Sequence, residues 1–323
     1  MNKVIRILLN LLIFAMVIGF VGYMVYSLGK GESFSGNNVM NNRNEEISPY
    51  KKINAIQVKS NIITFDLSDN NIYVAVNQEV MIYDMAGTLV RQFPVEKEIR
   101  DLKVEDNRIY LLYPSEIEVY TCEGEKIFGR PARRAESDYC SMALSAEFIF
   151  VTDAGNYNIC KYTKEGDYLD IILSPIGFII PSYAFDIINI RDTIYCSNSG
   201  RHRIESYTLE GQYIDSFGKA GSEAGSFAGC CNPGYLAATA NGDIITSEKG
   251  EPRISCFGRD GTFRTILFGS KALGGGTEAY KVKMHDDKIY IAGKKSLSVY
   301  VFDPELATQT ACADCPADCP LKK

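Results

Sequence analysis

Cysteine is the residue type whose spacing in this chain most directly suggests chemistry. Near the C-terminus, Cys312, Cys315 and Cys319 follow the pattern C-x2-C-x3-C-P. That pattern matches the last three quarters of the four-cysteine run that holds iron–sulfur clusters in bacterial ferredoxins. Gln309 stands where the first cysteine of the run would be, so a cluster would need a fourth ligand from elsewhere. The alternative, slightly favoured, is a flexible tail whose thiols form disulfides or bind metal adventitiously.

A second group of cysteines lies in the run GCCNPG, residues 229–234. A vicinal cysteine pair followed by Asn-Pro fixes a turn and can place two thiolates side by side. The missing cluster ligand could come from this pair, from Cys140, or from another chain. The alternative is a buried or disulfide-bonded corner, because cysteine often behaves as a small buried hydrophobe. The metal hypothesis therefore has these candidate ligands: Cys230, Cys231, Cys312, Cys315 and Cys319.

Three charged residues, Glu248, Lys249 and Arg253, lie close together further along the chain. A solvated hairpin tip explains such a group without any function. As a site they could bind a carboxylate or a phosphate, with the Arg253 guanidinium as a two-pronged donor. The chain has only two histidines and no G-x-S-x-G motif, so neither a histidine-based metal enzyme nor a serine hydrolase is indicated.

These residues need a scaffold, and a repeated unit in the chain predicts one. An aromatic residue followed four positions later by glycine recurs along the chain, as Tyr83/Gly87, Tyr120/Gly124, Tyr162/Gly166, Tyr207/Gly211 and Phe257/Gly261. Glycine suits a tight strand-to-strand turn that needs a positive φ. The intervals between the glycines are 37, 42, 45 and 50 residues, the length of one four-stranded propeller blade.

Alternating strand patterns fill five blades, and a sixth, at residues 279–302, is one strand short. A surplus strand at residues 52–58 precedes the first blade and would complete the sixth, which removes exposed sheet edges. The sequence therefore predicts an all-β, six-bladed β-propeller over residues 51–304, followed by a cysteine-rich tail over residues 305–323. A solenoid is the competing repeat architecture, but it needs capping ends and none is visible.

The loops that lead into the innermost strands of a propeller surround one mouth of its central channel. Aligning the blades places four residues near that mouth, and the charged hairpin adds three more. We expect the ligand-binding residues to be Arg100, Cys140, Tyr183, Asn232, Glu248, Lys249 and Arg253.

The stretch SNSGRHRIESYTLEG, residues 197–211, resembles the NHL repeat, whose core runs small-Gly-Asn-His-Arg-Ile before an aromatic residue and a glycine turn. The resemblance extends over residues 52–303, with Tyr157 and Asn158 where the family favours His and Arg. It implies a six-bladed propeller of a membrane-anchored bacterial type, in which His202 takes the place of a structural histidine. Members of the family include binding scaffolds, sensor ectodomains and a few lyases, so the resemblance does not decide between functions.

The N-terminus predicts a membrane anchor, residues 1–28. Between Ile7 and Tyr26 the only strongly polar residue is Asn10, and about 20 apolar residues span a bilayer core. Lys3 and Arg6 come first, so the positive-inside rule keeps the N-terminus cytoplasmic and exports the rest. A cleaved signal peptide is the alternative. The polar residues 29–50 form a flexible tether.

Composition narrows the function further. The net charge of −6 argues against nucleic acid as a partner. We expect a membrane-tethered, extracytoplasmic propeller that binds a protein or a small molecule. The alternative is a cell-envelope redox or metal-binding protein that uses the tail cysteines and the vicinal pair in an iron–sulfur type of site. An enzyme comes third. Ten cysteines in an exported domain normally indicate disulfides, unless the compartment keeps them reduced.

Overall fold

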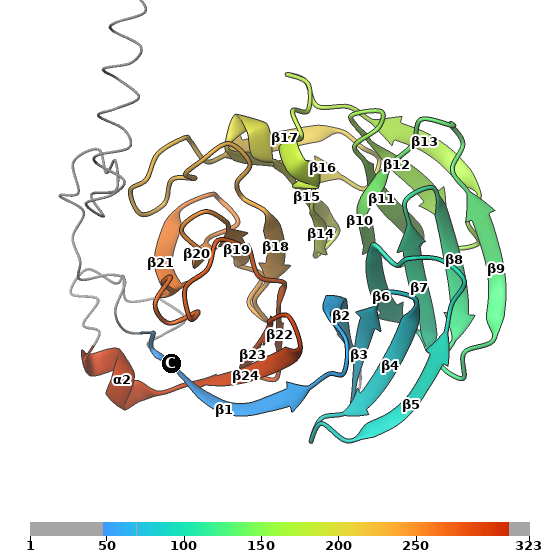
Figure 1. The fold of residues 1–323 in the computed structure, drawn as a ribbon. Helices are drawn as coiled ribbons and strands as arrows, with labels where there is room; N and C mark the ends of the chain where they lie inside the picture. The colour runs from blue at the N-terminus through green and yellow to red at the C-terminus, as the bar shows by residue number, and fades with distance from the viewer. Residues whose placement is uncertain (1–47, 69, 310–323) are drawn as a thin grey trace, which may run out of the picture. The chain divides into compact units, whose positions relative to one another are not determined.

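The computed structural model describes residues 48–68 and 70–309, whose strands form six four-stranded antiparallel sheets arranged as the blades of a ring (Figure 1). This confirms the predicted all-β, six-bladed propeller. No helix within these residues is long and apolar enough to cross a membrane. The predicted anchor, nearly all of the tether, and Cys312, Cys315 and Cys319 lie outside the described residues.

Each blade has four strands, ordered below from the innermost outward. Blade 1 is β2 (Ile62–Ser68), β3 (Asn71–Val76), β4 (Glu79–Asp84) and β5 (Leu89–Pro94). Blade 2 is β6 (Asp101–Glu105), β7 (Arg108–Tyr113), β8 (Glu116–Thr121) and β9 (Lys126–Pro131). Blade 3 is β10 (Tyr139–Leu144), β11 (Phe148–Asp153), β12 (Asn158–Thr163) and β13 (Tyr168–Ile172). Blade 4 is β14 (Ile187–Ile190), β15 (Thr193–Asn198), β16 (Arg203–Thr208) and β17 (Tyr213–Phe217).

Blade 5 is β18 (Tyr235–Ala238), β19 (Ile244–Glu248), β20 (Arg253–Phe257) and β21 (Phe263–Phe268). Blade 6 is β22 (Val282–His285), β23 (Lys288–Ala292), β24 (Ser296–Phe302) and, outermost, β1 (Tyr50–Gln57). Three short helices complete the described residues: η1 (Pro181–Tyr183), η2 (Ser199–Arg201) and α2 (Pro304–Gln309).

The ring is closed by β1, which pairs antiparallel with β24 from Tyr50 opposite Phe302 to Gln57 opposite Ser296. Its inward-facing Ile56 is 3% exposed and packs in the cluster shared by blades 6 and 1. The N-terminal and C-terminal strands of the propeller therefore pair in one sheet. This pairing completes blade 6 and covers the strand edge of β24 that would otherwise be exposed.

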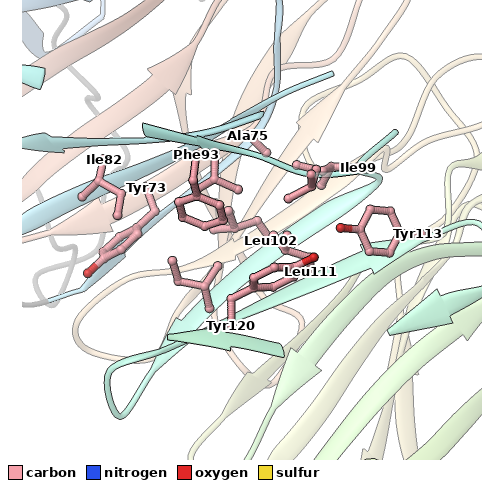
Figure 2. Close-up of a cluster of buried hydrophobic side chains, with 12 residues drawn as sticks. Tyr73, Ala75, Ile82, Phe93, Ile99, Leu102, Leu111, Tyr113 and Tyr120 are labelled. Carbon is pink, nitrogen blue, oxygen red and sulfur yellow. The ribbon is translucent and has the colours of Figure 1, made fainter. Parts of the chain in front are cut away.

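The hydrophobic core lies between the blades. Each of its six clusters joins side chains from two neighbouring blades. Figure 2 shows the cluster between blades 1 and 2, where Phe93 from β5 packs against Tyr120 from β8 with ring centroids 5.7 Å apart. Full burial of one such large side chain contributes about 1.5–3 kcal/mol, so the blades stabilise one another.

The five repeated glycines serve this packing as well as the turns. All have φ between 79° and 93°, as the turn prediction requires. A Cβ on any of them would also lie 2.4–2.8 Å from a side chain of the preceding blade's outer strand. For Gly124 that side chain is Phe93, and for Gly87 it is Ile56 of the closing strand. The glycines thus allow adjacent blades to approach closely, a role that the turn pattern does not reveal.

Two glycines with similar φ allow the turn role of glycine to be tested separately from its role in the close approach of blades. Gly124 and Gly250 have φ of 93° and 92°, but a Cβ on Gly124 would lie 2.8 Å from Phe93, whereas one on Gly250 meets nothing within 4 Å. Gly250→Ala should cost about 1–2 kcal/mol of backbone strain. Gly124→Ala should cost about 1–3 kcal/mol more because of the overlap. Denaturant unfolding of the two variants measures the difference, and equal losses would contradict the inter-blade role.

Candidate functional site

Loops that lead into the inner strands gather on one face of the ring, which we call the upper face. Two of the predicted residues meet there: the Arg100 guanidinium lies 5.3 Å from the centroid of the Tyr183 ring. The sequence missed their neighbour Asp138, whose carboxylate lies 3.4 Å from the Arg100 side chain. Ser182 and Tyr183 are both left-handed, with φ of 54° and 57°. This uncommon backbone presents Tyr183 at 56% exposure.

Cys140 lies on the same face, at the start of β10. Its thiol donates to the carbonyl of Asp138, with Sγ 3.7 Å from the oxygen. Burial, reinforced by the charge of Asp138, raises its pKa to about 12. Near neutral pH the Cys140 thiol therefore keeps its proton, which does not favour a role as a metal ligand or nucleophile.

The vicinal pair Cys230 and Cys231 lies in the loop between blades 4 and 5. The two Sγ atoms are 3.3 Å apart, and both residues are thiols. Cys230 is exposed, whereas Cys231 is 5% exposed. Burial opposes ionisation of Cys231, but hydrogen bonding and the charge of Lys249 outweigh it, and the pKa of Cys231 is lowered. Contact with Cys231 raises the pKa of Cys230.

Asn232 holds this loop against the β19–β20 hairpin. Its amide group donates to the carbonyls of Ala228 and Lys249 at 2.7 and 2.9 Å, and its oxygen accepts from the Lys249 N–H at 2.9 Å. Asn232 is 1% exposed, so all of these bonds are shielded from water. It therefore positions Lys249 beside the cysteine pair and does not itself face a ligand.

Inside the same hairpin, the buried Glu248 pairs with the partly buried Arg253. Arg253 donates from Nε and Nη2 to the two carboxylate oxygens at 2.8 and 2.7 Å. It also donates to three carbonyls in the loop ahead of blade 5, those of Ser222, Glu223 and Ser226. Glu248 is 2% exposed, so the interpretation of this residue as a solvated tip is wrong. The guanidinium fork that could have held an external anion is engaged with Glu248.

The predicted structural histidine has a specific contact. The His202 imidazole Nε2 lies within hydrogen-bond distance of the Gly229 carbonyl, directly before the cysteine pair. His202 has φ of 56°, and Tyr157 at the corresponding place in blade 3 has 53°. The shared left-handed conformation explains why these two hairpins look alike despite their different residues.

Sequence reasoning missed a charged network on the channel axis. The Asp101 carboxylate is completely buried and accepts hydrogen bonds from Thr64 Oγ1 at 3.0 Å and Met142 N–H at 3.0 Å. It also accepts from Lys103 Nζ at 2.6 Å, and Lys281 Nζ lies 3.7 Å away. These partners come from blades 1, 2, 3 and 6.

Asp186 extends the network to the other two blades. The Ser141 hydroxyl contacts both the Asp101 and the Asp186 carboxylates. Asp186 itself leads into blade 4, and its second oxygen accepts from the Leu236 N–H of blade 5 at 2.7 Å. All six blades thus contribute to one axial network.

Opposite charges set the ionisation of this network. Burial would raise the pKa of Asp101, but the charges of Lys103 and Lys281 outweigh it and lower the pKa. Burial would lower the pKa of Lys281, and Asp101 and Asp186 instead raise it. Both groups therefore stay charged near neutral pH. The sequence does carry a sign of this network. Charged residues stand at every second position of residues 101–103 and 281–283, which the blade pattern assigns to innermost strands next to the channel.

A cavity of about 860 Å³ opens on the upper face across blades 5, 6 and 1. It reaches the axial network through Lys281, whose ammonium lies 4.5 Å from the centroid of the Tyr235 ring. The apolar part of its wall includes Ile62, Ile63, Leu273, Ala279, Tyr280 and Ile291. Its charged residues are Lys52, Lys281, Lys294 and Glu278. A ligand with an acidic group and an apolar body matches this lining.

None of the His, Cys, Asp and Glu residues in the described part of the chain group in threes as a metal site would require. The tail ligands of the iron–sulfur hypothesis lie outside that part, so this hypothesis stays a prediction. The cysteines at positions 122, 140, 160, 196, 230 and 231 are thiols and not half-cystines.

Solved structures of similar fold include two lyases. A streptogramin B lyase structure aligns with a TM-score of 0.56 at 13% identity, covering 79% of this chain and 98% of that one. Virginiamycin B lyase from Staphylococcus aureus gives 0.56 at 11% identity, over 78% and 99% of the two chains. No protein-family model matches this chain, and no curated protein matches its sequence. At these identities the likeness shows the fold alone.

The axial network predicts an acid-sensitive stability. Because the pKa of Asp101 is lowered by folding, its contribution is present above the unfolded pKa of about 3.9 and is lost as the pH falls below that value. Asp101→Asn leaves Lys103 without its counter-charge and should cost about 3–5 kcal/mol at pH 7. It should also flatten the loss of stability below about pH 4.

Denaturant unfolding from pH 7 down to pH 3 measures both effects. Asp170→Asn, an exposed carboxyl on β13, is the matched control and should behave as the unmodified protein. An Asp101→Asn variant with the original pH dependence would contradict the assignment.

Proposed function

We propose that this chain is a membrane-tethered, extracytoplasmic β-propeller that binds a small molecule with an acidic group and an apolar body. The observation that carries the proposal is the upper-face cavity of about 860 Å³, whose lining includes the paired Lys281 and Tyr235. Ligand sites are typically concave and mostly apolar, with a few polar groups that fix orientation. This cavity combines apolar side chains with three lysines and one glutamate.

Charge supports an acidic ligand. Lys281 keeps its proton because Asp101 and Asp186 raise its pKa, and it lines the cavity with 17% of its side chain exposed. Lys52 and Lys294 are exposed at the rim, against Glu278 alone on the acidic side. An incoming anion meets rim charges first and a fixed, partly desolvated ammonium second. Partial desolvation strengthens that second interaction relative to the rim.

The location of the protein rests on its N-terminal residues. The apolar run between Ile7 and Tyr26 and the preceding Lys3 and Arg6 support an uncleaved anchor with the propeller outside the cytoplasm. The NHL-like stretch at residues 197–211 supports descent from that repeat family, whose members include binding scaffolds, sensor ectodomains and a few lyases. The surrounding loops, with exposed Tyr183, would also suit a protein partner on the same face.

Binding can be tested with 8-anilinonaphthalene-1-sulfonate, an anionic probe with an apolar ring system. We expect saturable binding to the folded protein at one site. Lys52→Glu combined with Lys294→Glu should weaken it about five- to thirtyfold, since each rim charge contributes about 0.5–1 kcal/mol. Fluorescence titration measures the affinity at a fixed ionic strength.

Lys51→Glu is the matched control. Lys51 and Lys52 are adjacent and exposed on β1, but only Lys52 lines the cavity. The control should bind the probe as the unmodified protein does. Equal weakening in both variants would point to the overall charge of the molecule and contradict a site in this cavity.

Exposed Cys230 offers a native reporter of location. Trypsin cleavage after Lys219 and Lys249 releases residues 220–249, which contain Cys230 and Cys231 but no other cysteine. When intact cells under mild reductant are treated with a membrane-impermeant maleimide, this peptide should be labelled, and Cys230→Ser should abolish the label. The full chain should also remain in the membrane after alkaline carbonate extraction. Labelling only after lysis would contradict the export of the propeller.

A further inference from the structure

The vicinal thiols combine two properties that are seldom adjacent. Cys230 is exposed to solvent, whereas Cys231, 3.3 Å away between the sulfur atoms, is buried. One thiol can therefore meet a partner in solution, while the other can react only with something already attached to its neighbour. The ligand-binding cavity described above includes neither residue.

Asn232 in the loop itself and three side chains from other parts of the fold build this arrangement. His202 contacts the carbonyl of Gly229, and Asn232 ties the loop to Lys249 through two hydrogen bonds and donates a third to Ala228 inside the loop. Lys249 and Ser182 then lie beside the buried sulfur of Cys231, where both favour its thiolate. The loop is therefore fixed from blade 4, from η1 and from the blade 5 hairpin.

We propose that Cys230 and Cys231 form a thiol–disulfide exchange site that reduces small disulfides, with Cys230 as the attacking thiol and Cys231 as the resolving thiol. The proposal needs no metal and none of the tail cysteines. In the described part of the chain, no further His, Cys, Asp or Glu joins the pair in a group that could hold a metal ion.

The reaction proceeds in two balanced steps. The Cys230 thiolate attacks a small disulfide RSSR, which forms a Cys230–SR bond, breaks the S–S bond of the substrate and releases RS⁻. The Cys231 thiolate then attacks Sγ of Cys230, which forms the Cys230–Cys231 bond and expels the second RS⁻. The two cysteines release their protons to water as they ionise, and the two RS⁻ take up protons from water, so that overall the protein loses two electrons and two protons and the substrate becomes two thiols.

The environment of Cys231 suits the second step. Thiolates and not thiols carry out the attack, and the adjacent Lys249 ammonium favours the Cys231 thiolate although burial opposes it. For Cys230 the main influence on the pKa is the adjacent Cys231 and not the Lys249 ammonium, and the pKa of Cys230 is raised. Attachment of a substrate should therefore be the slower step near neutral pH, followed by rapid ring closure.

Reaction of the full-length protein with 5,5′-dithiobis(2-nitrobenzoate) tests the two roles. After alkylation of remaining thiols and trypsin digestion, mass spectrometry of residues 220–249 reports on Cys230 and Cys231 alone. We expect the wild-type peptide to carry an internal disulfide and to be lighter than the dithiol by two hydrogen atoms. Cys231→Ser should retain one thionitrobenzoate adduct on Cys230. Cys230→Ser should react at least about tenfold more slowly at this peptide.

Two results would overturn the proposal: a wild-type peptide that remains a dithiol or carries two adducts, or a Cys230→Ser peptide that reacts as fast as wild type. Thermal melting of each variant establishes that the fold is retained. Because ring closure is read from the wild-type peptide, the proposal can be refuted even if a serine variant fails to fold.

Lys249 is a positioning residue in this scheme, and a pH profile distinguishes that role from a structural one. Lys249→Met should raise the pKa of Cys231, slow ring closure about tenfold at pH 7 and lose this defect as the pH rises. Lys249→Arg should retain the wild-type profile. In the methionine variant trypsin releases residues 220–253, which still contain only this cysteine pair. A pH profile of the ring-closure step, measured after attachment, that is unchanged by Lys249→Met would contradict the assignment of Lys249.

Discussion

The buried carboxylate of Asp101 is the interaction on which the centre of this propeller depends. An unpaired charge at such a position would be strongly destabilising, so the inner strands must deliver donors to it from several blades. They do so through Thr64, Lys103 and Met142, with Lys281 close by. Since these residues come from both ends of the ring, the network is complete only when the ring is closed. Closure by β1 and the axial charges therefore support one another.

The positions of the accessible lysines on the upper face depend on this central network and on the β19–β20 hairpin of blade 5. Lys281 reaches the cavity as a fixed cation because Asp101 and Asp186 hold its charge. In the same way, Lys249 reaches Cys231 because Asn232 holds its backbone. In both places, a buried polar residue holds an accessible lysine: Asp101 holds Lys281, and Asn232 holds Lys249. This division explains why several residues that looked like ligand contacts, Arg253 among them, are in fact supports.

The lyase structures of similar fold place the chain within a widely used architecture. A six-bladed ring can carry unrelated chemistry in its loops, because the blades fix only where the loops begin and end. At 13% identity, any activity must be argued from this chain's own side chains. The two proposals made for it, binding of an acidic ligand and thiol exchange, use separate residues of one face and can stand or fall separately.

The sequence by itself determined the repeat, the six blades and the positive-φ glycine turns, because these are set by residues near one another in the chain. It also indicated which loops share a mouth, since every blade has the same strand order, and Arg100 does meet Tyr183 there. Only the tertiary structure decided the partners of the charged residues. Asp101 meets Thr64 and Lys281 through the order of blades around the ring, and the Arg253 fork is filled by Glu248 and loop carbonyls. Such pairings depend on distances across the channel and on side-chain burial, and no local pattern encodes either.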